Sequence, residues 1–207
     1  SASPPAPWNV TSANTNFNTS YGLYVGHGSD GIFNITADAS ASYIFFGVGS
    51  NADPSMPPLA FVDPMFRVGD AGGSGTLDID LSTPPASPGG ARMQTSSTGL
   101  GVGLGAGSTG FVDVLGAGKT PEQMGYNSPN AVVFGYPQQN TVVGQLGGEG
   151  HVSIDGAGLV FQTGEANYPG STDPIRYFAV GDGAGGVGTV CAGQVFPDTA
   201  IGSLIAD

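Results

Sequence analysis

The chain has 207 residues, of which 37 are glycine and only four are lysine or arginine, and its formal net charge is −12. A hydrophobic fraction of 39 % and a charged fraction of 10 % predict a single folded domain over residues 1–207 rather than a disordered tail. The acidity argues against binding of nucleic acid or an anionic lipid surface through a basic patch. No apolar run approaches the roughly 18 residues of a membrane span, and the single cysteine, Cys191, provides neither an internal disulfide nor a zinc-type spacing.

The two ends of the chain differ from its middle. Residues 1–8 are rich in proline and are predicted to form a flexible leader. Residues 9–20 are mostly Asn, Thr and Ser and are predicted to form a polar N-terminal cap coil, with Trp8 over the end of the core. The last residues stop inside an apolar stretch, which indicates a fragment of a longer protein.

One pattern recurs five times between these ends. Each copy reads apolar-x-Val-Gly, then a glycine-rich turn, then Gly-x-apolar-x-apolar. The first segments start at Leu23, Phe66, Leu100, Thr141 and Phe178, and the second segments start at Gly31, Gly75, Gly110, Gly150 and Gly188. The period of two on both sides of each turn predicts two short strands per copy. The turn glycines supply positive φ angles or a close approach of backbones, so their role is architectural before it is functional.

A chain that repeats short strands without an amphipathic helix has to bury its apolar faces against its own next copy. The sequence therefore predicts an all-β fold, namely a right-handed parallel β-helix (β-solenoid) of roughly eight or nine coils, at about 20 to 25 residues per coil. Residues 44–49, 132–134 and 159–161 are interpreted as intermediate coils with diverged turns. A β-sandwich is the alternative, but it requires antiparallel pairing and gives no reason for a recurring motif.

Two of the copies carry a family resemblance. Residues 66–79 (FRVGDAGGSGTLDI) and 180–190 (VGDGAGGVGTV) resemble the passenger repeats of bacterial autotransporters. In that family a C-terminal outer-membrane barrel carries a right-handed parallel β-helix to the cell surface, and many members act in adhesion, self-association or biofilm formation. The resemblance extends from Tyr21 to Ala192 and implies the fold rather than a particular ligand. It also implies a secreted or surface-exposed chain, anchored through a region outside this sequence.

Carboxylates mark one face of the predicted strands. Asp78 and Asp80 lie two residues apart, and Asp113 and Asp155 follow comparable turns. Such a pair could cleave a polysaccharide by acid–base catalysis or hold Ca²⁺. The sequence favours a solvent-facing polar side of the strands instead, so no catalytic or metal-binding residue is assigned and no cofactor is expected.

The glycine turns carry the remaining polar candidates. His27 and His151, the only histidines, lie in or directly after these turns, where a solvated residue is expected rather than a general base. Asp70 and Asp182 follow the Val-Gly pair, and an Asx hydrogen bond to a turn amide is expected of each.

Insertions that contain proline, at residues 53–64, 84–90, 120–129 and 165–174, are predicted to project as loops. Aromatic residues near two of them are candidates for stacking on sugar rings or anchoring a protein partner: Tyr126, Phe134, Tyr136, Tyr168 and Tyr177. Packing of the loops onto the body of the protein is the alternative.

The leading functional hypothesis is a non-enzymatic segment of a surface protein that acts in adhesion, self-association or biofilm formation. Its expected partner is a protein or glycan on another cell, or a second copy of itself. One alternative is a polysaccharide-active β-helix enzyme or a fragment of one. The other is a passive structural spacer within a larger surface protein, which would bind no ligand.

Overall fold

The computed structural model describes residues 5–12, 15–19, 22–37, 44–48, 66–82, 92–96, 99–116, 131–134, 141–155, 160–163, 178–192 and 203–206. Within these residues every regular element is a β-strand, and all the recorded strand pairs are parallel. The prediction of an all-β fold with parallel strands is therefore confirmed. The described strands show none of the antiparallel pairing that a β-sandwich requires.

The described strands form three sheets, named A, B and C here. Sheet A contains, in spatial order, β1 (Trp8–Ser12), β4 (Gly31–Ala37), β7 (Ser74–Leu81), β10 (Thr109–Gly116), β13 (Glu149–Asp155) and β16 (Val187–Ala192). Sheet B contains β2 (Thr15–Thr19), β5 (Ile44–Val48), β8 (Arg92–Ser96), β11 (Ala131–Phe134), β14 (Val160–Thr163) and β17 (Ser203–Ala206). Sheet C contains β3 (Leu23–His27), β6 (Phe66–Asp70), β9 (Leu100–Leu104), β12 (Thr141–Gln145) and β15 (Phe178–Asp182).

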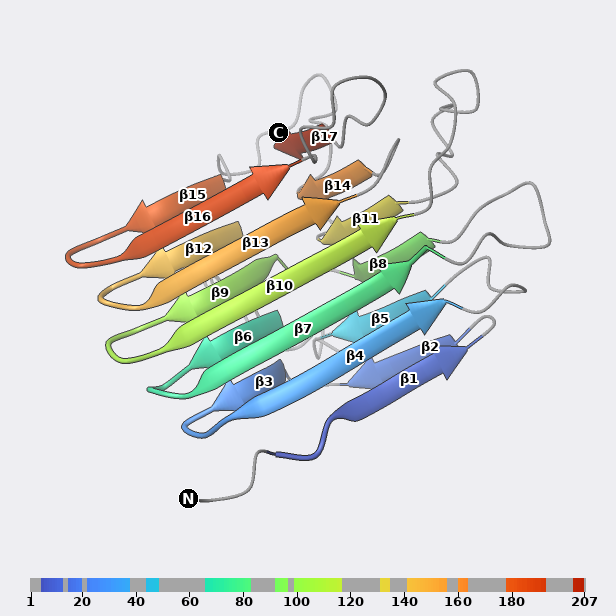
Figure 1. The fold of residues 1–207 in the computed structure, drawn as a ribbon, viewed down its shortest axis with the longest axis horizontal. Helices are drawn as coiled ribbons and strands as arrows, with labels where there is room; N and C mark the ends of the chain where they lie inside the picture. Colours follow the sequence, from blue (N-terminus) through green and yellow to red (C-terminus); the bar gives the residue numbers. More distant parts are fainter. Residues whose placement is uncertain are drawn as a thin grey trace, which may run out of the picture.

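Along the chain, successive strands enter sheets A, B and C in that order, and the order then repeats. We call one such set of three strands a unit. Sheet A forms one layer in Figure 1, and sheets C and B lie behind it with their strands running in the opposite direction. Sheet C lies beside the tight turns that lead back into sheet A, and sheet B lies toward the other end of the sheet A strands (Figure 1). This stack of units is consistent with a β-solenoid.

The five copies of the sequence motif stack in register. The valines that precede the turn form one ladder of sheet C: Val25, Val68, Val102, Val143 and Val180. The glycines that follow the turn form one ladder of sheet A: Gly31, Gly75, Gly110, Gly150 and Gly188. Both strands predicted for each copy are therefore confirmed, and so is the stacking of copy upon copy.

The buried hydrophobic side chains that the structure describes form one core cluster, to which sheets A and C both contribute. Along β7 the burial alternates, so that Leu77 and Ile79 point inward while Asp78 and Asp80 lie on the outer face. Phe66 of β6 reaches the same core from sheet C and is fully buried. Burial of one such side chain contributes about 1.5–3 kcal/mol, so a ladder of apolar residues through successive units is a large stabilising term.

The first glycine of each turn permits the units to approach closely. Gly26, Gly69, Gly103 and Gly144 have φ angles of 72°, 72°, 65° and 73°. A Cβ atom on Gly69 would collide with the backbone carbonyl of Thr109, and one on Gly103 would collide with that of Glu149. Only glycine fits such a position without a shift of the backbone, which explains its recurrence in the sequence.

The expected repeat length is wrong. Register partners in sheet A are 25 residues apart for Trp8 and Phe33, but 44 for Gly31 and Gly75 and 35 for Ser74 and Thr109. Among the described residues sheet A has six strands, so the count of eight or nine coils is not met. The reason is sheet B: the stretches interpreted as intermediate coils overlap β5, β11 and β14, which pair with other strands of sheet B and not with the motif strands.

Trp8 begins β1, the first strand of sheet A. Its ring stacks on Phe33 with 4.9 Å between centroids and an interplanar angle of 20°. Phe33 is buried, whereas Trp8 is 49 % exposed. Trp8 therefore lies over the end of the core, as expected from its position, and the chain is already in a strand at the last residue of the predicted leader.

Candidate functional site

The outer face of sheet A carries the carboxylates singled out in the sequence. Asp78 of β7 and Asp113 of β10 are register partners on adjacent strands. Asp80 lies in the next row, where its partners are Thr36 of β4 and Leu115 of β10. Asp78 and Asp80 thus share one face, as expected, but the residue next to Asp78 across the sheet is a second carboxylate.

This face is hollowed into a shallow depression of about 290 Å³. Its lining includes Asp78, Asp80, Asp113, Leu115 and Asp155. Burial of Asp78, and then the negative charge of Asp113, raise the pKa of the Asp78 carboxyl above its ordinary value of 3.8. The depression is therefore acidic, with one carboxyl that holds its proton more tightly than usual.

Asn34 of β4 lies on the other side of Asp78. Its Nδ2 atom donates a hydrogen bond of 2.8 Å to Oδ1 of Asn9 on β1. The Oδ1 atom of Asn34 is buried and has no hydrogen-bond partner. An unsatisfied buried acceptor costs about 1–3 kcal/mol, so this row of polar side chains is incomplete at Asn34.

The chemistry available to the acidic face is limited by its geometry. A carboxyl with a raised pKa beside a second carboxylate is an arrangement that acid–base catalysts use. Glycosidases, however, place their two carboxyl groups on either side of a scissile bond, whereas Asp78 and Asp113 are neighbours along one ladder. The polysaccharide-active alternative therefore stays a prediction.

For a metal ion, the face offers no complete ligand set. Within the described residues, no group of three or more His, Cys, Asp or Glu side chains is arranged to hold one. The Oδ1 atom of Asp80 accepts a 2.8 Å hydrogen bond from the backbone N–H of Ser82 instead. No residue of this face is therefore identified as a metal ligand.

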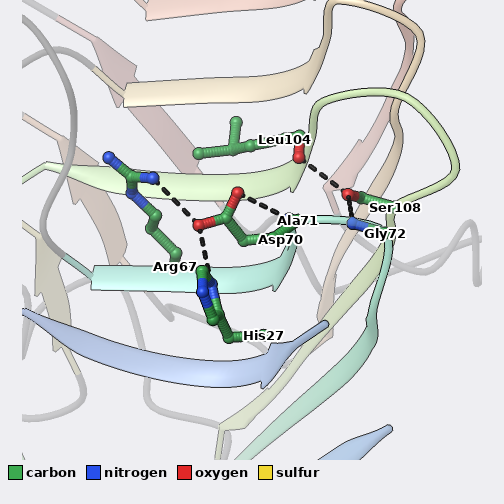
Figure 2. A network of polar contacts seen from close by, with 7 residues as sticks. All are labelled: His27, Arg67, Asp70, Ala71, Gly72, Leu104 and Ser108. Carbon is green, nitrogen blue, oxygen red and sulfur yellow. Dashed lines mark hydrogen bonds and ion pairs between the residues drawn. The ribbon is translucent and has the colours of Figure 1, made fainter. Parts of the chain in front are cut away.

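A second polar cluster lies at the turn after β6 and is centred on Asp70 (Figure 2). The Nη1 atom of Arg67 donates to Asp70 Oδ2 over 2.9 Å, and His27 Nδ1 of the preceding unit lies 3.2 Å from the same oxygen. The other oxygen, Oδ1, accepts a 2.8 Å hydrogen bond from the backbone N–H of Ala71. The expected Asx contact at Asp70 is thus confirmed, and two cationic or titratable partners are added to it.

This Asp70 cluster connects three consecutive units. The Arg67 guanidinium also lies over the ring of Tyr24, with 5.5 Å from its central carbon to the ring centroid. On the far side of the turn, the Gly72 N–H donates to Oγ of Ser108, whose hydroxyl donates to the Leu104 carbonyl. Both oxygens of Asp70 are occupied, so the arrangement fastens neighbouring turns rather than presenting a free base.

The second histidine lies on the outer face of sheet A. The His151 ring stacks on Phe111 of the neighbouring strand, with 5.0 Å between centroids and an interplanar angle of 9°. Its Nε2 atom lies 2.9 Å from a carboxylate oxygen of Glu149. Phe111 is 39 % exposed, so this pair forms a flat aromatic patch beside the acidic depression.

The aromatic candidates of the loops are not brought together by the described structure. Tyr126, Tyr136, Tyr168 and Tyr177 lie outside the described residues. Phe134 is the last residue of β11 in sheet B, so it belongs to a strand and not to a loop. Asp182 accepts a 3.0 Å hydrogen bond from Gln145 Nε2 of the preceding unit, a partner that the sequence did not indicate. Cys191 is exposed and unpaired on β16.

No family model, no curated protein and no solved structure matches the chain significantly. In the part of the chain that the structure describes, no helix is long and apolar enough to cross a membrane. A function can therefore be proposed only from the fold and from the surfaces described above.

Proposed function

We propose that this chain is a segment of an exported surface protein, similar to an autotransporter passenger, and that it acts without catalysis in adhesion, self-association or biofilm formation. In this proposal the stacked units form a right-handed parallel β-helix. The observation that carries the proposal is the recurrence in register of the glycine turn, where a Cβ atom on Gly69 or Gly103 would strike the next copy of the motif. Such a sequence maintains an elongated stack, which is a scaffold for display.

The partner is a protein or glycan on another cell, or a second copy of the chain. Two kinds of surface support contact of this sort. One is the outer face of sheet A, where the exposed Phe111 and Leu115 lie among carboxylates. The other is the set of insertions between strands, because binding residues commonly lie on loops held by a rigid scaffold.

Surface display tests the contribution of the loops. The full chain is displayed on cells that do not clump by themselves, and settling and attachment to glycan-coated or protein-coated surfaces are measured. Replacing Tyr126, Tyr136, Tyr168 and Tyr177 together by alanine is expected to reduce clumping or attachment several-fold. These side chains were chosen because they lie outside the described strands, whereas removal of residues 120–137 would also remove β11.

The matched control exchanges residues 84–90, an insertion without aromatic residues, for a Gly-Ser segment of equal length. This control is expected to behave as the unchanged chain. Equal clumping and attachment by the aromatic variant and the unchanged chain would contradict contact through the loops. A displayed, folded chain that neither clumps nor attaches would favour the passive spacer.

A further inference from the structure

A row of polar side chains crosses four strands on the outer face of sheet A. Asn9, Asn34, Asp78 and Asp113 are successive register partners on β1, β4, β7 and β10. Each therefore lies beside the next at the spacing of about 4.8 Å between hydrogen-bonded strands. The only side-chain hydrogen bond recorded within this row runs from Asn34 Nδ2 to Asn9 Oδ1, at 2.8 Å.

The direction of that hydrogen bond determines what Asn34 needs on its other side. The nitrogen and the oxygen of an amide point in different directions, so an Nδ2 atom that is bonded to Asn9 on β1 leaves the Oδ1 atom of Asn34 available to a donor on the β7 side. This atom is buried and has no partner. Its neighbour on β7 is Asp78, which can only accept hydrogen bonds when ionised but gains an O–H donor when protonated.

We propose that Asp78 is the proton-binding residue of a pH-sensitive polar ladder on sheet A. With its proton, Asp78 donates a hydrogen bond to Oδ1 of Asn34 and links β4 to β7. Without the proton, Asn34 Oδ1 has no donor, and the charges of Asp78 and Asp113 repel each other across the ladder, which weakens the pairing of β7 with β10.

The surroundings of Asp78 supply no compensating charge among the described residues. On the outer face, β4 contributes the uncharged Asn34 and Thr36, β10 contributes Asp113, and β7 itself contributes Asp80. The titratable groups of β3 and β6 are Tyr24, His27, Arg67 and Asp70, and they belong to sheet C, which packs against the inner face. One strand beyond β10, β13 carries Glu149, His151 and Asp155, with the uncharged Ser153 opposite Asp113.

The electrostatics agree with this geometry. Burial, and secondarily the charge of Asp113, raise the pKa of Asp78 above its ordinary value of 3.8 in the folded chain. A group with a raised pKa binds its proton more tightly when folded, so protonation stabilises the fold. This contribution is fully present below pH 3.8, the ordinary value, and is lost as the pH rises through the raised pKa.

The test compares urea midpoints from about pH 3.5 to about pH 8 for the unchanged chain and single variants. The midpoint of the unchanged chain is expected to fall as the pH rises through this window. D78N carries a permanent amide donor and no charge, so its midpoint is expected to exceed that of the unchanged chain at neutral pH. Its pH dependence is also expected to be flatter.

The matched control is D80N, which removes the same charge from the same strand. Asp80 has no carboxylate partner across the ladder, so D80N is expected to keep the pH dependence of the unchanged chain. Equal flattening by D80N and D78N would overturn the proposal, because the dependence would then reflect the overall acidity of the chain.

A direct titration of the Asp78 carboxyl by carbon-13 NMR tests the ladder in the unchanged chain. A midpoint above 3.8, the ordinary value, is expected. A midpoint at or below 3.8 would overturn the proposal, because it would show that Asn34 has turned its amide to donate to an ionised Asp78.

Discussion

At the scale of single residues, the two glycines of each turn are required for different reasons. Gly69 has a positive φ and lies against the carbonyl of Thr109, so both its backbone conformation and the close approach exclude a side chain. Gly75 has no positive φ, but a Cβ atom there would meet the carbonyl of Val25 in the preceding copy of the motif. The sequence predicts both glycines from their recurrence, but it does not reveal which backbone each one approaches.

Alanine at Gly103 and at Gly105 should separate these two effects. Both residues have positive φ, at 65° and 85°, but a Cβ atom would collide with Glu149 at the first and would meet nothing within 4 Å at the second. G105A is expected to lower the free energy of unfolding by about 1–2 kcal/mol, the cost of a left-handed backbone for an L-residue. G103A is expected to cost about 1–3 kcal/mol more because the turns must move apart. Equal losses in urea unfolding would contradict the close approach as the reason for Gly103.

At the scale of elements, each turn between sheets C and A is bonded to its neighbours along the stack. The backbone N–H of Gly28 donates to Asp70, that of Thr109 donates to Gly73, and that of Glu149 donates to Ser108. The alternation of inward and outward side chains predicted that Asp78 points outward, because this alternation can be read from the sequence of a single strand. The meeting of Asp70 with His27, and of Asp78 with Asp113, depends on register across the unit and was not predicted.

Ser108 shows what signal was available for such contacts. It stands at the turn position where three other copies carry Gly73, Gly148 and Gly186, whereas the first copy carries Ser29. A departure from a glycine that three of the five copies share can mark a position with a local role. That role is visible in the structure, where Ser108 is only 2 % exposed and bridges Gly72 to Leu104.

S108A is expected to lower the free energy of unfolding by about 1–3 kcal/mol, because it leaves a backbone N–H and a carbonyl without their partner. The measurement is urea unfolding at constant pH. S153A is the matched control, because Ser153 lies exposed on the outer face of sheet A. Similar midpoints for S108A, S153A and the unchanged chain would show that the bridge between turns does not stabilise the fold.

At the scale of the whole molecule, the motif predicted stacking correctly but the repeat length incorrectly. The stretches 44–49, 132–134 and 159–161 are apolar and short, and nothing in such a run distinguishes a strand of a third sheet from a diverged copy of the motif. The pairing of β5 with β2 and β8, and of β11 with β14, settles the matter. The length of the repeating unit therefore includes three strands, and not only the two strands that carry the motif.

Deletion of a whole unit follows from this register. Ser74 and Thr109 are partners 35 residues apart, so removal of residues 74–108 joins Gly73 to Thr109 and preserves the length of the turn. β10 then takes the place of β7 against β4, and β12 takes the place of β9 against β6. The shortened chain is expected to keep a β-sheet circular dichroism spectrum and a cooperative thermal transition.

The comparison is a chain that lacks residues 79–98, a length of about 20 residues that corresponds to the coil predicted from the motif alone. This deletion removes part of β7 and all of β8. The unit that ends with β9 then lacks a complete sheet A strand and has no sheet B strand. Although it removes fewer residues, it is expected to abolish the cooperative transition. A cooperative thermal transition for the chain that lacks residues 79–98, and none for the chain that lacks residues 74–108, would show that the repeating unit does not consist of three strands.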